Sequence, residues 1–485
     1  MKKYRDLWNG SLIRAIELLL DMIVIFFSFF VIAEVNHIIE EGAFIGPIEL
    51  VAFYDGNWVY VLIYALVSLI FFVVYRPTIT TQQYSKAIGS VALSILLTNL
   101  TLVVLSFMEK GEFLLGGKEN ILFVFLIQLL IFIVYKYITF IIVSKHNRRE
   151  VVIVGPKQEA LDLASALLRD TGINKKIKYV VFEDEHKRVP NALFNYINEV
   201  NDVYLTAGLK EQNKNKIMNY VLLDTYKEIY MVPKTYEIGL LKSIQTQVDD
   251  TLVFRMKSMH LSFEQRFMKR AFDILVSTIG LIIAFIPMLI IALAIKLEDG
   301  GPVFYKQERM KRNNKIFKVL KFRSMKVHNE DENEKIASVN DNRITKVGKV
   351  IRMLRVDELP QLLNIFKGEM SLVGPRPLML AVIEQTLKDH PEFRYRSNVK
   401  PGLTGLAQIS SRYDTKDNEK LRYDLYYIRN YSFWYDLKIL LLTVKTVLTK
   451  EQSVGREFNE TFEDKVSNGS IVTEAIPSGY KIISK

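Results

Sequence analysis

Cysteine is absent from this chain of 485 residues, and only six histidines and three tryptophans occur in it. The absence of cysteine excludes disulfides, thiolate nucleophiles, iron–sulfur clusters and zinc sites built on cysteine. It is also what a reducing compartment permits.

Acidic residues are fewer than basic ones: the chain has 64 Lys and Arg residues and 53 Asp and Glu residues, which gives a formal net charge of +11. This excess suits an anionic partner, which could be nucleic acid, a lipid surface or a phosphorylated substrate. Hydrophobic residues make up 49% of the chain and charged residues 24%, so the two kinds must be segregated along it. At about 100–200 residues per domain, the length accommodates about three units.

Four hydrophobic runs lie near the N-terminus, and each is long enough to cross a bilayer, for which about 20 apolar residues are needed. They extend approximately over Ser11 to Ala33, Trp58 to Tyr75, Ala87 to Phe107 and Ile121 to Val143. The first run exceeds the apolar core of a cleavable signal peptide, and three more runs follow it. The sequence therefore predicts a membrane protein in which residues 1–149 form a four-helix transmembrane bundle.

The orientation of this bundle can be predicted from the basic residues in its short loops, which stay in the cytoplasm. Lys2, Lys3 and Arg5 precede the first run, whereas the loop over residues 34–57 has five acidic residues and no Lys or Arg. That loop is predicted to lie outside. Four spans then leave the chain after about Arg148 in the cytoplasm.

Residues 150–254 show the alternation of short apolar strands and polar helices that is typical of a parallel, Rossmann-like α/β domain. The predicted strands are Val151 to Val154, Tyr179 to Phe182, Asp202 to Leu205 and Glu228 to Val232. A dinucleotide site usually needs Gly-x-Gly-x-x-Gly after the first strand, and only Gly155 is present there. We expect a domain without a functional dinucleotide loop, with a structural or dimerising role.

The main enzymatic alternative is a membrane-bound nucleotide-sugar epimerase or dehydratase, which would need a helical Tyr-x-x-x-Lys pair. The chain has this spacing only from Tyr230 to Lys234, and Pro233 between them cannot sit inside a helix. A non-catalytic membrane scaffold in polysaccharide export is the second alternative. It would explain the spans and the basic surface, but not the carboxylates described below.

A fifth apolar run of 22 residues, Ile274 to Ile295, carries no charge and contains Pro287. Basic residues flank it on both sides, so both of its ends prefer the cytoplasmic face. A helix over about residues 266–298 that enters the leaflet, breaks at Pro287 and returns would satisfy both ends. A simple fifth span is the alternative.

The stretch from Arg255 to Lys326 brackets this run and holds fifteen Lys or Arg residues against five acidic ones. Such a surface should bind anionic headgroups or phosphates, and a membrane-embedded neighbour makes nucleic acid a poor partner. The polar stretch Val327 to Arg343 then reads as a mobile loop, and residues 451–485 as a polar C-terminal tail.

The adjacent carboxylates Asp357 and Glu358 are the strongest candidates for catalysis or metal binding. Pro360 suits the first turn of a helix over Gln361 to Phe366, so the pair lies just before a helix N-terminus. Adjacent carboxylates could hold Mg²⁺, and an aspartate can act as a nucleophile towards phosphorus. Considered alone, such a pair beside arginines is more often a salt-bridged helix start.

Four motifs supply a wider context. They are Lys315–Met325 (KIFKVLKFRSM), Arg352–Gln361 (RMLRVDELPQ), Gly368–Pro377 (GEMSLVGPRP) and Lys400–Gln408 (KPGLTGLAQ). In this order they resemble the bacterial sugar transferase family, the monotopic polyprenyl-phosphate phosphoglycosyl transferases. The resemblance covers about Gln265 to Thr449, and with the four spans and the α/β insert the chain looks like the larger subgroup that hands hexose-1-phosphate to undecaprenyl phosphate. Two departures are Ile286, where relatives often have Ser, and Asn342, where Asp-Pro-Arg is common.

The resemblance implies an α/β catalytic domain over residues 255–450 and a two-step reaction on a UDP-hexose. Asp357 would attack the sugar-bearing phosphorus and expel UMP, and undecaprenyl phosphate would then take the phospho-sugar. Mg²⁺ would neutralise the diphosphate, with Asp357 and Glu358 as its ligands. The implied location is the bacterial inner membrane, with the catalytic domain on the cytoplasmic face.

The resemblance also suggests the residues that bind substrate. Arg352 and Arg376 match family positions suited to phosphate binding, because Arg supplies a bidentate fork. Lys321 and Arg323 are further candidates, with a helix-surface or lipid-facing role as the alternative. The segment containing Gly402, Thr404, Gly405 and Gln408 could approach the nucleotide or form a plain turn. Membrane lipids and a second copy of the chain complete the expected partners.

Overall fold

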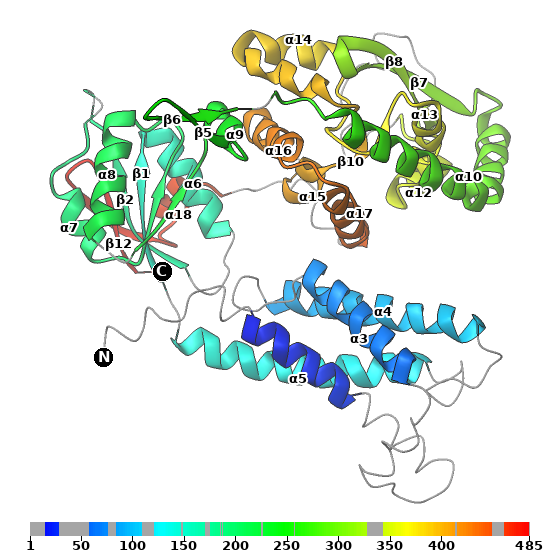
Figure 1. Cartoon of the computed structure of the whole chain (residues 1–485), viewed down its shortest axis with the longest axis horizontal. Helices are drawn as coiled ribbons and strands as arrows, with labels where there is room; N and C mark the ends of the chain where they lie inside the picture. The colour runs from blue at the N-terminus through cyan, green and yellow to red at the C-terminus, as the bar shows by residue number, and fades with distance from the viewer. Residues whose placement is uncertain are drawn as a thin grey trace, which may run out of the picture. The chain divides into compact units, whose positions relative to one another are not determined.

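The computed structural model describes the chain in segments that divide into two compact units (Figure 1). One unit comprises Met1–Val232 with Glu457–Lys485, and the other comprises Pro233–Arg456. The described residues are 15–28, 58–75, 84–108, 121–146, 149–169, 175–184, 186, 188–224, 227–256, 258–326, 343–412, 415–448 and 460–484. The predicted external loop, nearly all of the predicted polar loop from Val327, and Asn342 lie outside them.

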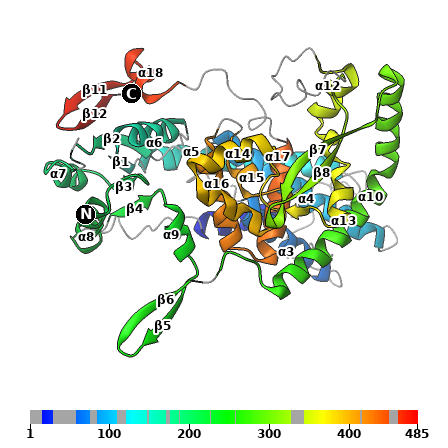
Figure 2. The same ribbon diagram turned by 90° about the horizontal axis from the view of Figure 1, so that it is seen from above.

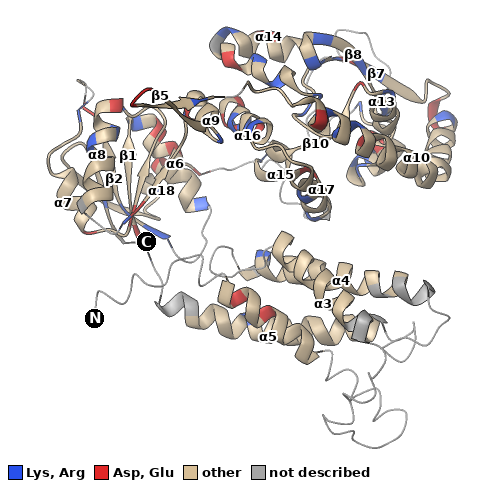
Figure 3. Cartoon of the chain, viewed as in Figure 1, with Lys and Arg blue, Asp and Glu red and all other residues tan. Residues whose placement is uncertain are grey.

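The four predicted N-terminal runs are represented by four helices that share one hydrophobic core. They are residues 15–28, α3 (Trp58–Tyr75), α4 (Tyr84–Met108) and α5 (Ile121–His146). The part of α5 over Leu122–Ile142 is long and apolar enough to cross a membrane, whereas α3 and α4 contain shorter apolar stretches. Figure 3 shows few charged residues on α3, α4 and α5.

Polar side chains of these helices point inward, where they satisfy one another. The Gln128 amide donates to the Tyr64 hydroxyl over 2.9 Å and accepts from Asn99 over 3.0 Å. Lys136 is fully buried and pairs with Glu17 at 3.0 Å and with Asp21 at 2.6 Å. Large apolar side chains such as Leu62 and Leu130 are exposed instead, which is the arrangement expected for helices surrounded by lipid.

A mixed sheet in the order β11-β12-β2-β1-β3-β4 forms the α/β part of the first unit. The four strands β2-β1-β3-β4 run parallel, with core residues on both faces of the sheet. The elements are β1 (Arg149–Gly155), α6 (Lys157–Arg169), β2 (Lys175–Phe182), α7 (Leu193–Asn198), β3 (Asp202–Leu205), α8 (Glu211–Asp224) and β4 (Glu228–Met231).

Two residues considered in the sequence have structural surroundings in this sheet. Gly155 ends β1 where a Cβ atom would lie 2.0 Å from the Thr206 hydroxyl oxygen, so the missing side chain admits Thr206. Tyr230 lies in β4 and stacks on Tyr204 with the ring centroids 4.6 Å apart. Tyr230 and Lys234 therefore do not share a helix.

The C-terminal segment is a correction to the predicted polar tail over residues 451–485. Its described part folds as α18 (Phe462–Ser467) and a hairpin of β11 (Val472–Ile476) and β12 (Gly479–Ser484). Strand β12 pairs antiparallel with β2 and extends the sheet, and Phe462 is fully buried. The segment is polar on average, but Phe462, Ile471 and Ile482 belong to the hydrophobic core beside α6.

We predict that Phe462→Ala destabilises the α/β part by about 3–5 kcal/mol, because it empties a closed core position. Protection of the C-terminal hairpin from trypsin, measured on the full chain in detergent, should be lost at a lower urea concentration than in the parent. Glu463→Ala, on the exposed side of the same helix, is the matched control. Equal urea dependence of the two variants would contradict this account.

The second unit contains an antiparallel hairpin, a small parallel pair of strands and the helices around them. Its hairpin joins β7 (Phe304–Lys311) to β8 (Lys315–Phe322), and β9 (Ser371–Val373) pairs with β10 (Gly402–Thr404). The helices are α9 (Thr235–Leu240), α10 (Phe263–Asp299), α12 (Lys346–Met353), α13 (Gln361–Lys367), α14 (Leu380–Asp389), α15 (Leu406–Ser410), α16 (Asp417–Arg429) and α17 (Phe433–Leu448). The unit begins at Pro233, so α9 and the exposed hairpin of β5 (Ile244–Val248) and β6 (Thr251–Arg255) belong to it and not to the predicted 150–254 domain.

Helix α10 is the longest described element, with 37 residues and Pro287 in its interior. The ribbon changes direction along its length in Figure 2 but stays helical. Its middle is largely unpacked, and Ile282 and Ile283 are each 72% exposed. The buried residues of α10 are Lys269, Asp273, Ser277, Ala284 and Ile295. The helix thus buries three polar side chains in the protein and leaves many of its large apolar side chains exposed.

The N-terminal part of α10 is tied to the core by two buried carboxylates. The Lys269 ammonium donates to Asp436 over 2.5 Å and to the Tyr427 hydroxyl over 3.1 Å. The Asp273 carboxylate accepts from the Ser371 hydroxyl and from the Leu372 backbone N–H, each over 2.9 Å. The bonds of Asp273 connect α10 to β9, and those of Lys269 connect it to α16 and α17.

Candidate functional site

Asp357 and Glu358 lie on a single 3-10 turn, η4 (Val356–Glu358), between α12 and α13. Arg355 precedes the turn with φ of +56°, a left-handed conformation that redirects the chain after α12. Helix α13 then begins at Gln361, immediately after Pro360, as the sequence predicts. The two carboxylates are therefore held at the junction of two helices.

Two cationic side chains from other parts of the unit contact the Glu358 carboxylate. Its Oε1 accepts from Lys321 Nζ over 2.8 Å and from Arg376 Nη2 over 3.0 Å. Burial opposes ionisation of Glu358, but Arg376 and Lys321 outweigh it and hold the pKa of this carboxyl far below its ordinary value. Glu358 therefore stays negatively charged throughout the physiological pH range.

The pKa of the Asp357 carboxyl is shifted in the opposite direction. Burial and the charge of Glu358 raise the pKa of the Asp357 carboxyl, while Lys321 and Arg352 counteract the rise. The Arg352 guanidinium is oriented by a hydrogen bond of 2.7 Å from Nε to the Ser324 hydroxyl. Adjacent carboxyls with opposed pKa shifts are a common feature of catalytic sites, because the two groups can then take different roles.

Arg309 is a further cation of this site that the sequence analysis counted only as part of a basic flank. Burial, and then the neighbouring charge of Arg376, lower the pKa of the Arg309 guanidinium to about 10. The register of the hairpin pairs Tyr305 with Lys321 and Arg309 with Phe317, so Arg309 and Lys321 lie on one face. The two-residue period of β7 and β8 was the signal that could have identified it.

The loop that carries Arg376 is fixed by its neighbours. Arg396 Nη2 donates to the Arg376 carbonyl over 3.0 Å, and the Arg396 Nε donates to the buried Asp424 over 2.6 Å. The Pro375 carbonyl accepts from the Gly402 N–H over 2.9 Å. Arg376 is thus positioned from both the main chain and a buried ion pair.

The predicted nucleotide-binding segment packs against the chain that leads to Arg376. Cβ atoms at Gly402 and Gly405 would lie 2.1 Å from backbone atoms of Gly374, so both glycines admit the chain that leads to Arg376. Thr404 shares a hydrogen bond of 2.7 Å with Thr443, and the Gln408 amide donates to the Leu403 carbonyl over 3.0 Å. Both glycines are therefore required for this close packing, and nucleotide binding by the segment stays a prediction.

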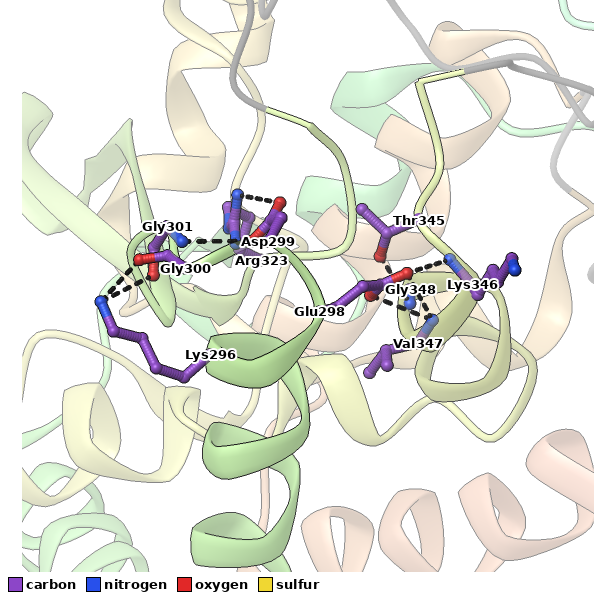
Figure 4. Close-up of polar contacts among 10 residues, drawn as sticks. All are labelled: Lys296, Glu298, Asp299, Gly300, Gly301, Arg323, Thr345, Lys346, Val347 and Gly348. Carbon is purple, nitrogen blue, oxygen red and sulfur yellow. Dashed lines mark hydrogen bonds and ion pairs between the residues drawn. The ribbon is translucent and has the colours of Figure 1, made fainter.

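Arg323, a further predicted phosphate-binding residue, has an acidic partner in the structure. It is 7% exposed and pairs through both terminal nitrogens with Asp299, the last residue of α10. Figure 4 shows this pair beside Glu298, which accepts from the Lys346 N–H over 2.7 Å and so caps α12. Arg323 therefore fixes the end of α10, and the neighbouring cap connects that end to the helix carrying Arg352.

The donor set of the site fits Mg²⁺ only with help from a substrate. Within the part of the chain that the structure describes, no group of three or more Asp, Glu or His side chains could hold a metal ion. Asp357 and Glu358 offer two carboxylates, which are hard oxygen ligands. Mg²⁺ in nucleotide sites is commonly held by one or two carboxylates together with substrate phosphates.

Comparisons with known proteins agree with this geometry. The sequence model of the family described as Bacterial sugar transferase matches residues 264–450, which include α10 and all of the site. The UDP-N-acetylgalactosamine-undecaprenyl-phosphate N-acetylgalactosaminephosphotransferase of Aeromonas hydrophila is 41% identical over 216 residues, 42% of this chain and 51% of that protein.

Two UDP-glucose:undecaprenyl-phosphate glucose-1-phosphate transferases are also similar. The protein of Escherichia coli (strain K12) is 38% identical over 51% of this chain and 54% of its own length. The protein of Klebsiella pneumoniae is 34% identical over 62% of this chain and 68% of its own length. The chain thus spans about half the length of the first two relatives and just over two thirds of the third.

We predict that Gly405→Ala disrupts the loop that positions Arg376, because the new methyl group would clash with the Gly374 carbonyl. Overpacking of this kind costs about 1–3 kcal/mol, and each kcal/mol lowers the thermal midpoint by about 2–4 °C in a domain of this size. Gly239→Ala is the control, since its Cβ would make only ordinary contacts, with Met259 at 3.7 Å and with Met256 at 4.0 Å. Thermal unfolding in detergent with the same midpoint for both variants would contradict the packing role.

Proposed function

Because the chain belongs to the bacterial sugar transferase family, we propose that it transfers hexose-1-phosphate from a UDP-hexose to undecaprenyl phosphate. The products would be undecaprenyl-diphospho-sugar and UMP, in the first membrane step of capsule, exopolysaccharide or O-antigen assembly. The relatives are named for N-acetylgalactosamine, glucose and galactose, so the proposal extends to the UDP-hexose class. The observation that carries it is the half-buried Asp357, whose pKa is raised, beside an ion-paired Glu358.

In the proposed first half-reaction, an oxygen of the Asp357 carboxylate attacks the phosphorus that bears the sugar. An aspartyl–phosphorus bond forms, the bond to the UMP oxygen breaks, and UMP leaves with the electron pair. In the second half-reaction, an oxygen of the lipid phosphate attacks the same phosphorus. The aspartyl bond breaks, the Asp357 carboxylate is regenerated, and the diphosphate of the lipid product is complete.

The cations around Asp357 support this chemistry. Lys321, Arg352 and Arg376 would neutralise the charge that develops on the phosphate oxygens. Because Glu358 stays ionised, it would keep Lys321 and Arg376 directed at the site between turnovers. Asp357 and Glu358 would hold Mg²⁺ when it accompanies the substrate, and Mg²⁺ would polarise the diphosphate.

Helix α10 supports membrane insertion from one side. Its start is bonded to β9 and its end to α12, and both belong to the second unit. A spanning helix would place these two ends on opposite sides of the bilayer. We therefore propose that α10 re-enters the leaflet at Pro287, with the catalytic unit on the cytoplasmic face of a bacterial inner membrane and the N-terminal helices as spans.

The enzymatic alternative finds less support. An epimerase or dehydratase needs a pyrophosphate loop, and Gly155 packs against Thr206. It also needs a tyrosine and a lysine on one helix, whereas Tyr230 stacks in a strand. A scaffold without catalysis leaves the opposed pKa shifts of Asp357 and Glu358 unexplained.

Substitutions at the two carboxylates test the reaction. Asp357→Asn should abolish UMP release from UDP-hexose, because a neutral amide cannot form the acyl phosphate. Glu358→Gln should lower turnover severely, since Lys321 and Arg376 would lose their charged partner. The measurement is UMP released by the purified full chain with undecaprenyl phosphate and a panel of UDP-sugars.

Asp417→Asn is the matched control, because the same change is made at an exposed helix start. This variant should keep parental activity. Retention of more than a few per cent of activity in a folded Asp357→Asn protein would remove the nucleophile role. Glu358→Gln that still releases UMP but fails to make lipid product would place Glu358 in the second half-reaction.

Cysteine accessibility tests the topology, because the parent chain has no cysteine to give background labelling. Single cysteines at Glu264 and Lys306, which flank the apolar part of α10, should both label from the cytoplasmic side. A cysteine at Gly46, in the predicted external loop, should label from outside. Labelling of Lys306→Cys from outside would show that α10 spans the membrane.

A further inference from the structure

A small cavity of about 230 Å³ lies against the first turns of α10. Its walls come from three segments: the start of α10, the tip of the β7–β8 hairpin, and the residues just before β10. The lining residues are Leu261, Arg266, Lys269, Arg270, Asp273, Arg312, Asn398, Val399 and Lys400. None of them is Asp357, Glu358, Lys321, Arg352 or Arg376, so the cavity is not part of the site described above.

The charges around this cavity do not balance. Five cationic side chains line it, and Asp273 is the only carboxylate among the lining residues. Asp273 is already engaged by Ser371 and Leu372, and Lys269 is neutralised by Asp436 outside the cavity. An excess of positive charge therefore remains inside.

With Lys269 neutralised, four cations carry this excess, namely Arg266, Arg270, Arg312 and Lys400. Arg270 donates to the carbonyls of Ile365 and Phe366, each over 2.7 Å, and these neutral partners leave its charge in place. Within the described residues, Arg312 and Lys400 take part in no hydrogen bond or ion pair. Lys400 is half-buried, and burial together with the charge of Arg270 lowers the pKa of its ammonium.

The volume and the position of the cavity restrict the ligand. A space of about 230 Å³ accommodates a phosphate group but is smaller than the usual 300–1,000 Å³ of a pocket for a drug-sized ligand. Exposed apolar side chains of α10 alternate with the residues that line the cavity and continue beyond them, namely Phe267, Met268, Ile274, Leu275 and Ile279. A ligand with an anionic head and a hydrocarbon tail would match both features at once.

From this combination we infer that the cavity binds the phosphate of a membrane lipid, with the lipid chain lying along the apolar face of α10. Arg312 and Lys400 would contact the phosphate oxygens, and Arg270 would form the inner wall. Two sources share this chemistry, a structural anionic phospholipid and a polyprenyl phosphate. The inference does not rest on the proposed reaction, because binding can be measured without any UDP-sugar.

The test is native mass spectrometry of the full chain released from detergent, with phosphatidylglycerol, a short-chain polyprenyl phosphate or inorganic phosphate added in separate titrations. The parent should retain at least one of the two lipids and bind inorganic phosphate far more weakly. Arg312→Gln and Lys400→Met should each weaken lipid retention about fivefold, since a basic residue near a lipid surface contributes about that factor.

Lys315→Gln is the matched control, because it removes one exposed charge from the same hairpin outside the cavity. It should leave lipid retention unchanged. Preference for phosphatidylglycerol would assign the cavity to a structural lipid, and preference for the polyprenyl phosphate would assign it to the acceptor. Equal retention in the double variant Arg312→Gln/Lys400→Met and in Lys315→Gln, or equally tight binding of inorganic phosphate, would overturn the inference.

Discussion

The ion pairs of Glu358 join three segments that are far apart in the sequence, since Lys321 comes from β8, Glu358 from the turn before α13, and Arg376 from the loop after β9. A mostly buried carboxylate without a cation would cost several kcal/mol, so the fold must bring at least one of the two cations to it. Both arrive, and the excess of positive charge remains available beside Asp357. The same contacts that satisfy Glu358 thus supply the cations of the proposed phosphate site.

Helix α10 meets a second constraint if it enters the membrane as proposed, because it would then have to face lipid and still hold the second unit in place. It does so by reversing the usual distribution of side chains. Lys269 and Asp273 point into the protein, where Asp436 and the backbone of β9 satisfy them, and the large aliphatic side chains remain exposed. At its other end, Glu298 caps α12 and Asp299 holds Arg323.

Local patterns in the sequence were sufficient to predict the parts of the fold that depend on residues close together in the chain. The parallel strands β1 to β4 and the helix start after Pro360 follow from short apolar runs and from the preference of proline for a first helical turn. The placing of Asp357 and Glu358 at this helix start follows as well. Lys321 and Arg376 were identified by their motifs, and the structure adds that both contact one carboxylate.

Other features depended on contacts between distant segments, which one sequence does not contain. The sequence predicts Arg323 as a phosphate-binding cation, and only the structure reveals its ion pair with Asp299. The sequence predicts Gly402 and Gly405 as part of a nucleotide-binding loop, and only the structure reveals that the backbone of Gly374 packs against them. The C-terminal hairpin has a polar composition, and only its pairing with β2 explains why Phe462 is buried.

The central claim is that Asp357 carries the phospho-sugar between two half-reactions. Its most direct test is to incubate the purified chain with UDP-hexose and Mg²⁺ in the absence of any lipid phosphate, and to follow both UMP and the mass of the protein. The account predicts a burst of at most one UMP per chain, a mass increase equal to one hexose phosphate, and location of that mass on the peptide containing Asp357. UMP release that occurs only when lipid phosphate is present, with no change in protein mass, would contradict it.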